Sequence, residues 1–343
     1  MFEKIDVWII ISLIGLSLFS LFTILGIDRG LFFTQLVFFI VGFILFFVAV
    51  RIGVDFLRLN SLNFYIAFII MLLITFFLGN IVRGSRRWIH FYFFNVQSSE
   101  FFRPFFILFL ADLLSSRMDS FKKAAVSFII FFIPFAIILL QPDLGNALIY
   151  TGVYTSLLFL AGMPISYFIN AGIAFLLVSP AAWFFLHGYQ KQRIISFINP
   201  EEHARDLSYN LIQAIITVGS GAFFGRGLGL GTQSRFLFLP ENHTDFAFAS
   251  LVEQFGFVGG ITVIILFAVI LYRLLLKARK VKANRFQFLF IVGSILFLLI
   301  PVFFNIGMNL GLLPVAGVAL PLISYGGSSI VSTLIMIGLA LSI

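Results

Sequence analysis

The amino-acid sequence predicts an all-α polytopic membrane protein with ten transmembrane helices. Hydrophobic residues make up 61% of its 343 residues and charged residues only 10%, whereas soluble globular domains are about 45–50% apolar and about 25% charged. The apolar residues form runs close to the roughly 20 residues that cross a bilayer as a helix. These runs are apolar on every face, unlike the alternating strands of a membrane barrel.

The ten predicted spans are separated by polar turns, and Ser, Thr and Gly recur within them, as in helices that pack against each other. The fourth span is the weakest, because it is short and carries Arg103 and Asp112. The first is too long for a cleavable signal peptide. In chain order the spans are Val7–Gly26, Leu31–Val50, Leu62–Gly79, Phe101–Leu114, Ala124–Leu140, Leu144–Ala161, Ile165–Leu186, Phe246–Tyr272, Phe286–Met308 and Leu322–Ile343.

Composition excludes several function classes. A water-soluble enzyme and a disordered chain are excluded by the apolar content. The chain has no cysteine, which excludes a disulfide framework, a thiol nucleophile and a zinc-thiolate site. The net charge of +8 does not indicate a nucleic-acid partner, because in a membrane protein the position of each charge relative to the bilayer matters more than the sum.

Orientation follows from Lys and Arg in the short loops, which are enriched on the cytoplasmic side. This rule predicts that both termini are cytoplasmic and that the basic loop Arg273–Arg285 faces inward against anionic lipid head groups. Residues 1–343 form a single transmembrane domain, and its one long loop, His187–Asp245, lies outside between the seventh and eighth helices. Chemistry is therefore expected at the outer surface of the membrane.

A glycine-rich motif, Gly219–Ser234, stands out in this loop. Glycine at alternate positions from Gly225 to Gly231 lets backbone N–H groups approach an anion, and Arg226 and Arg235 add positive charge. The motif is neither a Walker A loop nor a dinucleotide fingerprint. A phosphate contact and a hairpin without a ligand are equally compatible with the spacing.

Asp245 is the last charged residue before the apolar span that starts at Phe246. A carboxylate at the rim of a low-dielectric cavity is desolvated, and the resulting basicity suits a general base. The alternative is a helix N-cap formed by Thr244 or Asp245. Glu241 and His243 lie nearby, but a structural role suits them better than metal binding, and no protein metal site is predicted.

Charged residues near the outer ends of other spans are further candidates. Arg86 and Arg87 precede the fourth span. Glu100 and Arg103 share one helix face three residues apart, either as a functional pair or as a structural ion pair. Asp143 caps the sixth helix or lines the cavity.

Two other features of the outer half carry expectations. Glu253, seven residues into the eighth span, needs a polar partner or water at that depth. The apolar segment Leu207–Phe224 is expected to lie in the membrane interface.

Together these segments resemble the SEDS family of cell-wall polymerases (shape, elongation, division and sporulation), most closely its RodA branch. The match runs almost end to end, although Tyr209-Asn-Leu-Ile-Gln-Ala looks closer to the division branch, FtsW. The motifs that carry it are Gly84-Ser-Arg-Arg-Trp-Ile, Gln97-Ser-Ser-Glu, Gln141-Pro-Asp-Leu-Gly, Tyr189-Gln-Lys-Gln-Arg-Ile, Asn199-Pro-Glu, Leu211-Ile-Gln, Gly219-Ser-Gly, Gly231-Thr-Gln-Ser, Leu239-Pro-Glu-Asn-His-Thr-Asp-Phe, Asn305-Ile-Gly-Met-Asn and Leu320-Pro-Leu-Ile-Ser-Tyr-Gly-Gly-Ser-Ser.

The resemblance implies a peptidoglycan glycosyltransferase of the bacterial cytoplasmic membrane that polymerises lipid II into glycan strands for cell elongation and rod shape. Lipid II is a disaccharide peptide on undecaprenyl pyrophosphate, and inversion without a covalent sugar–enzyme intermediate is implied. The family's essential aspartate falls on Asp245, as the base for the acceptor hydroxyl. Its other site positions fall on Arg86, Arg87, Glu100, Arg103 and Asp143.

Four positions depart from the family pattern and none of them is Asp245. Ser98 stands for Pro, Arg103 for Lys, Asn146 for Thr and Gln254 for Glu. Arginine keeps the charge of lysine but differs in geometry.

An anionic lipid substrate needs cations beside its pyrophosphate. The candidates are Arg86, Arg87, Arg103, Arg193 and Arg226. A divalent cation, Mg²⁺ or Mn²⁺, bridging the pyrophosphate is compatible with this chemistry, but no motif demands one. The implied partner is a class B penicillin-binding protein, a transpeptidase.

Two rival functions remain. A lipid II flippase would use the same cavity, but it should show internal repeats and charged or broken helices near the midplane. No clear repeat is visible, and the acidic candidates sit mostly at outer edges. A non-catalytic scaffold of the cell-wall synthesis complex is the second rival, and the presence of Asp245 argues against it.

Overall fold

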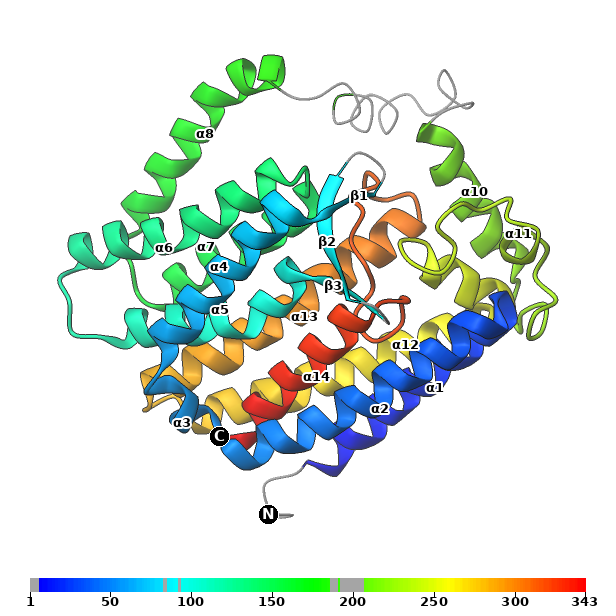
Figure 1. Ribbon diagram of the computed structural model, residues 1–343, viewed down its shortest axis with the longest axis horizontal. Coiled ribbons are helices and arrows are strands. Elements are labelled where there is room, and N and C mark those ends of the chain that lie inside the picture. The colour runs from blue at the N-terminus through cyan, green and yellow to red at the C-terminus, as the bar shows by residue number, and fades with distance from the viewer. Residues whose placement is uncertain (1–5, 83–84, 92–93, 186–190, 192–206) are drawn as a thin grey trace.

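The computed structural model describes residues 6–82, 85–91, 94–185, 191 and 207–343. The described chain is mostly helical, and one helix lies over each predicted span (Figure 1). The long helices are α1 (Val7–Ile27), α2 (Arg29–Ile52), α4 (Ser61–Leu78), α5 (Ser98–Ser115), α6 (Ser120–Leu140), α7 (Leu144–Leu160), α8 (Ile165–Phe185), α12 (Ala247–Lys280), α13 (Arg285–Asn309) and α14 (Gly327–Ser342). The shorter helices are α3 (Val54–Arg58), α10 (Leu207–Ser220) and α11 (Thr232–Arg235).

Among the described residues, six helices are long and apolar enough to cross a membrane: α1, α2, α4, α6, α12 and α13. Helices α7 and α14 are apolar but shorter. Helix α5 carries Glu100, Arg103 and Asp112 within its 18 residues. The length and apolar composition of these helices are those of a multi-pass membrane protein.

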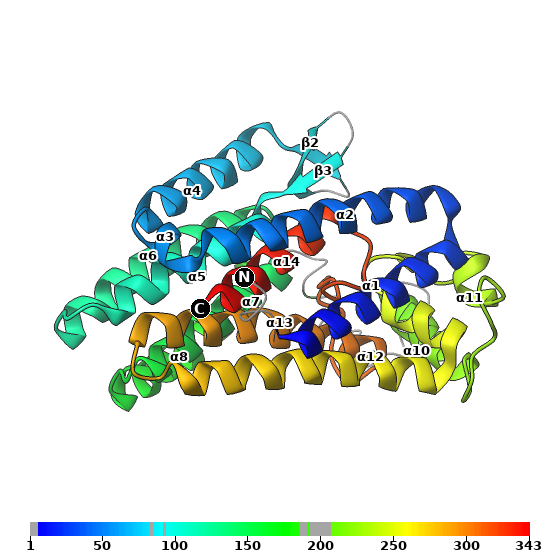
Figure 2. The same ribbon diagram turned by 90° about the horizontal axis from the view of Figure 1, so that it is seen from below.

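Helices α13 and α14 form the centre of the bundle. Helix α14 packs along α2 and α5, and α13 packs against α12, α5 and α7. Figure 2 shows α1 and α12 side by side along one edge, in agreement with the packing of α1 on α12. A Cβ atom on Gly338 would lie 2.7 Å from the backbone oxygen of Phe46, so glycine permits the close approach of α14 and α2.

Polar contacts tie together the helix ends that the sequence assigns to the cytoplasmic side. Arg273 pairs with Asp6 at 2.6 Å, and Arg58 pairs with Asp112 at 2.7 Å. The hydroxyl of Ser342, at the end of α14, accepts from the backbone N–H of Val54 at 3.0 Å. The helix ends assigned to one side of the membrane are thus neighbours in the fold.

Three strands between Asn80 and Gln97 form an antiparallel sheet, so the prediction of a purely α-helical chain was wrong here. The strands are β1 (Asn80–Val82), β2 (Ser85–Phe91) and β3 (Phe94–Gln97), in the order β1-β2-β3. Trp, Ile and Phe in β2 favour strands. A search for long apolar spans overlooks a segment that is short and charged. The strand-favouring residues of β2 were nevertheless present in the sequence.

The eighth and tenth spans also differ from the prediction. Helix α12 continues to Lys280, past the expected end at Tyr272, and breaks at Gly256, where φ is 71° and ψ is −170°. Helix α14 starts at Gly327 rather than Leu322, because residues 310–326 form an irregular segment that makes tertiary hydrogen bonds.

Candidate active site

Asp245 lies in the turn that leads into α12, and four consecutive backbone carbonyls of this turn are tied to other parts of the fold. Ser250 Oγ donates to Asn242 O at 2.8 Å, and Tyr325 N donates to His243 O at 2.7 Å. Ser324 Oγ donates to Thr244 O at 2.6 Å. The fourth carbonyl, that of Asp245, accepts from the amides of Asn305 and Asn309 at 2.9 and 3.1 Å.

The helix-capping alternative for Thr244 is wrong. Phe246 occupies the cap position of α12, and the Thr244 hydroxyl donates to Glu241 Oε2 at 2.9 Å instead. Glu241 itself has a φ of 55°, in the left-handed region that non-glycine residues rarely adopt. Such strain persists only where the surrounding structure enforces it, and it clusters at functional sites.

Residues 322–325, which hold the Asp245 turn, are themselves supported by α1 and α2. Ser20 Oγ donates to Ile323 O at 2.8 Å, and Gln35 Nε2 donates to Ser324 O at 3.2 Å. Leu322 has a φ of 61°. The turn that carries Asp245 and the turn that supports it therefore each contain a strained non-glycine residue.

A second polar cluster lies at the start of α5 and α7. Arg103 Nη2 lies 2.6 Å from Glu100 Oε1 and 2.7 Å from Asn146 Oδ1. Asn146 Nδ2 donates to Asp143 Oδ2 at 2.8 Å, and Arg87 Nη1 lies 3.7 Å from Asp143 Oδ1. Four of the predicted residues thus form one network, with Asn146 as the link between its two ion pairs.

The network is almost entirely removed from solvent. Glu100 and Arg103 are each 4% exposed and Asp143 is 1% exposed, whereas the Arg87 side chain is 25% exposed. Ion pairs taken out of water must be compensated by geometry and additional hydrogen bonds. The Arg103 guanidinium also lies 5.9 Å from the centre of the Phe297 ring, a favourable cation–π contact.

Of the two roles that the sequence left open for Asp143, the structure shows the helix cap. Its carboxylate caps α7 by accepting from Asn146 N at 3.3 Å. It also accepts from Gln97 Nε2 at 3.0 Å. Arg87 anchors the same turn through the carbonyls of Gln141 and Pro142.

The segment 320–332 joins the two clusters. Beyond Ser324, which holds the Asp245 turn, Ser328 Oγ accepts from Gln97 N at 2.9 Å. Ser332 Oγ donates to Glu100 O at 2.7 Å. The segment 320–332 therefore contacts the turn of Asp245 through Ser324, before α14, and the Glu100 carbonyl of α5 through Ser332, within α14.

Glu253 has the polar partners that its depth in α12 requires. Its carboxylate accepts from Gln233 N at 2.8 Å, from Ser234 N at 3.0 Å and from Ser234 Oγ at 2.6 Å. These donors form the first turn of α11, where the helix dipole also favours a negative charge. Glu253 therefore fixes the end of the glycine-rich motif to α12.

Backbone N–H groups of the glycine-rich motif donate hydrogen bonds to other carbonyls of the protein. Arg226 N donates to Glu253 O at 2.9 Å, Gly227 N to Gln254 O at 3.1 Å, and Gly225 N to Gly221 O at 2.8 Å. The first two bonds join the motif to α12 beside its break, and the third lies within the motif. This use of the N–H groups favours a structural hairpin over a backbone phosphate cradle.

Arg86 and Arg226, two of the remaining predicted cations, are not part of the buried network. Arg86 is exposed on β2, and neighbouring residues of a strand point to opposite faces, so it lies on the other face from Arg87. Arg226 is exposed and donates from Nε to Ser220 O at 3.0 Å. Arg193 lies outside the described residues.

Sequence reasoning gave no role to several polar residues that build the site. Gln97, Asn146, Asn305, Asn309 and Ser324 are all buried and make the hydrogen bonds described above. A polar side chain within an apolar span is costly unless it has a partner. The presence of these polar residues in or beside apolar spans was therefore the signal in the sequence that pointed to them.

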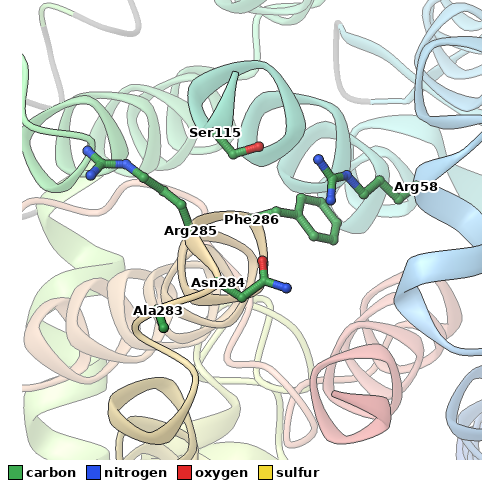
Figure 3. A pocket seen from close by; sticks show the side chains of 6 residues that line it. All are labelled: Arg58, Ser115, Ala283, Asn284, Arg285 and Phe286. Atoms are coloured by element: carbon green, nitrogen blue, oxygen red, sulfur yellow. The ribbon is translucent and has the colours of Figure 1, made fainter. Parts of the chain in front are cut away.

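A cavity of about 530 Å³ lies at the opposite helix ends, between α3, α5 and the start of α13. Figure 3 shows the Arg58 guanidinium beside the Phe286 ring, with Arg285 pointing to the other side. Arg58 is 4.3 Å from the ring centre and is paired with Asp112. None of the predicted site residues lines this cavity.

The chain is similar to known proteins of one family. The family model described as cell cycle protein, of the FtsW, RodA and SpoVE type, matches residues 3–343. The chain is 36% identical over 285 residues to the peptidoglycan glycosyltransferase MrdB of Escherichia coli K12, covering 81% of this chain and 76% of that protein. It is 34% identical over 287 residues to the probable peptidoglycan glycosyltransferase FtsW of Thiomicrospira cyclica, covering 80% and 72%.

A solved structure agrees with the fold. It concerns the structural coordination of polymerization and crosslinking by a peptidoglycan synthase complex. The matched chain has a TM-score of 0.83 and 27% sequence identity, over 98% of this chain and 96% of that chain.

Proposed function

The chain belongs to the FtsW, RodA and SpoVE family of cell cycle proteins, the SEDS family, and is a peptidoglycan glycosyltransferase; we propose that it polymerises lipid II with Asp245 as the general base. The observation that carries this proposal is the placement of Asp245. It lies in a turn held by α12, α13 and the 320–326 segment. The same segment continues into α14, which contacts the buried ion-pair network.

All ten helices are proposed to span the membrane, with both termini cytoplasmic and residues 187–245 outside. In this topology Glu100, Asp143 and Asp245 stand at or near the outer ends of α5, α7 and α12. The contacts between the two polar clusters support this arrangement, because helix ends on opposite sides of a bilayer could not share them. The reaction then takes place at the outer face.

In the proposed reaction, the GlcNAc 4-hydroxyl of the acceptor attacks the anomeric carbon of the donor sugar. The Asp245 carboxylate takes the hydroxyl proton as the new glycosidic bond forms. The bond from the anomeric carbon to the pyrophosphate oxygen breaks, and undecaprenyl pyrophosphate leaves with the electron pair. A single displacement of this kind inverts the configuration at that carbon.

The arginines divide between two proposed roles. Arg86, Arg87 and Arg226 retain exposed surface and are proposed to meet the pyrophosphate, together with Arg193. Arg103 is buried against Glu100 and Asn146. It is proposed to shape the floor of the substrate site, with Asp143, and to influence lipid II binding through that shape.

A divalent cation, Mg²⁺ or Mn²⁺, is assigned to the substrate pyrophosphate rather than to a protein cage. The described residues contain no group of three or more His, Asp and Glu side chains that could hold a metal ion. Magnesium sites commonly use one or two carboxylates together with substrate phosphates. A bound cation would supply charge neutralisation at the leaving group.

The proposed partner is a class B penicillin-binding protein. The similar solved structure is that of a complex that coordinates polymerization and crosslinking. A transpeptidase beside the outer loop would receive the glycan strand as it forms. Elongation and rod shape are the proposed cellular roles, and lipids of the cytoplasmic membrane surround the helices.

The experiment that tests this function uses purified protein in nanodiscs supplied with lipid II and Mg²⁺, with and without the transpeptidase. Glycan strands are expected from the protein alone, and the partner should raise the rate. In parallel, the protein is placed in liposomes with fluorescent lipid II. Movement of lipid II between leaflets without strand formation would establish the flippase instead, and the absence of both activities would favour the scaffold.

A further inference from the structure

We propose that Asn305 and Asn309 of α13 are positioning residues for Asp245. They hold the main-chain carbonyl of Asp245 and thereby set the direction in which its carboxylate leaves the turn. The inference rests on the proposed role of Asp245 as the base. It explains how the protein orients the carboxylate of that base.

Two side-chain amides converge on one carbonyl oxygen. Asn305 Nδ2 donates to Asp245 O at 2.9 Å, and Asn309 Nδ2 donates to the same oxygen at 3.1 Å. The two residues are four apart on α13, so they project from the same helix face. Both side chains are fully buried, with 0% exposure.

Each amide is itself fixed by further hydrogen bonds. Asn305 Nδ2 also donates to Val318 O at 2.7 Å, and Asn309 Nδ2 donates to Asn305 O at 2.8 Å. Asn309 Oδ1 accepts from Ala249 N, in the first turn of α12, at 3.0 Å. Asn309 thus holds both Asp245 and the first turn of α12.

The geometry around Asp245 explains why a positioning role is needed. Phe246, the next residue, occupies the cap position of α12, and Glu241 begins the turn in a strained conformation. The Asn amides fix the peptide plane after the Asp245 Cα atom, and Ser324 Oγ, which donates to Thr244 O, fixes the plane before it. Together the two planes set the Cα–Cβ direction of Asp245. A catalytic group displaced by about 1 Å can lose roughly a hundredfold in rate.

A general packing role predicts something different. Ser294, another fully buried polar residue of α13, donates within its own helix to Phe290 O at 2.9 Å. It contributes to the helix without reaching the active-site turn. Asn305 and Asn309 instead donate hydrogen bonds to Asp245, the residue that bears the proposed base. Removing either side-chain amide should therefore slow the chemical step.

The test compares steady-state lipid II polymerisation by the full chain in nanodiscs for wild type, Asn305→Ala, Asn309→Ala and the double variant. Rates are expressed per mole of folded protein, measured from thermal unfolding. We expect kcat to fall at least about tenfold in one single variant and further in the double variant. KM for lipid II should stay within about twofold, because both amides are fully buried.

Leu298→Ala is the matched control, since Leu298 is fully buried in α13 and its truncation leaves a destabilising cavity in the same helix. Its kcat per folded protein should stay within about twofold of wild type. Equal losses of kcat in Leu298→Ala and the Asn variants would overturn the positioning role, as would wild-type kcat in both Asn single variants.

A second comparison separates this inference from the proposed function. In the Asp245→Asn background, adding Asn309→Ala should slow the residual rate by less than about twofold, because the carboxylate that it positions is absent. A further loss as large as in the wild-type background would overturn the inference. A wild-type rate in Asp245→Asn alone would instead refute the base, and Asn309 would then have no base to position.

Discussion

At the scale of single residues, two departures from the family pattern contact each other. Arg103 stands where the resemblance leads one to expect Lys, and Asn146 stands where it leads one to expect Thr. The structure places Arg103 Nη2 2.7 Å from Asn146 Oδ1, while the same guanidinium nitrogen lies 2.6 Å from Glu100. The wider guanidinium and the longer amide therefore complement each other across α5 and α7.

This contact predicts that the two substitutions are energetically coupled. Arg103→Lys should lower the free energy of unfolding by about 1 kcal/mol or more, because an ammonium cannot reproduce the geometry of the guanidinium. Adding Asn146→Thr should recover part of the loss, with a coupling of roughly 0.5–3 kcal/mol. Chemical unfolding of the four proteins of this cycle in micelles measures it, and strictly additive effects would contradict it.

Glu253 gives a second prediction at this scale. Glu253→Gln replaces one acceptor oxygen with an NH₂ group that faces the donors of α11, and it should cost about 1–3 kcal/mol. Hydrogen exchange should rise in residues 225–235, which the carboxylate holds to α12. Asp119→Asn is the control, because Asp119 is exposed and makes no side-chain cap bond. Equal exchange in the two variants would count against the anchor.

At the scale of elements, the helices could be predicted because apolar length is a physical requirement of the bilayer. The sheet at residues 80–97 could not be found in that way, since it is short and charged. The late start of α14 depends on Ser324 and its tertiary partners, which no local pattern reveals. The break of α12 depends likewise on backbone contacts with the glycine-rich motif.

The break at Gly256 is the clearest case. Its φ and ψ lie in a region that is essentially restricted to glycine, and a Cβ atom there would lie 2.3 Å from Gly225 N. Gly256→Ala should therefore cost about 2–4 kcal/mol. Gly172→Ala, in α8, meets nothing within 4 Å and should leave the midpoint of thermal unfolding unchanged or slightly raised. Similar midpoints for both variants would contradict the account of the break.

At the scale of the whole molecule, the residue types of the site were predictable but their assembly was not. The carboxylates and arginines stand out in an apolar chain because charge is costly there. Which of them meet depends on contacts between distant segments, such as Glu100 with Ser332 and Asp245 with Asn305. Sequence spacing carries no information about these pairings.

The topology is directly testable because the chain contains no cysteine. In intact cells, a membrane-impermeant maleimide should label Leu228→Cys, in the proposed outer loop. It should label Ala283→Cys, in the proposed cytoplasmic loop, only after the membrane is permeabilised. Both positions carry exposed side chains, so access rather than burial decides the result. The reverse pattern would invert the proposed orientation.

The most direct measurement of the central claim is the single-turnover rate of lipid II coupling by purified Asp245→Asn protein. If Asp245 is the general base, the rate should fall by about 10²–10⁴-fold, while the unfolding midpoint and lipid II binding are retained. Asp55→Asn, which alters an exposed carboxylate at the opposite helix ends, should couple lipid II at the wild-type rate. A wild-type rate in Asp245→Asn would show that another group accepts the proton.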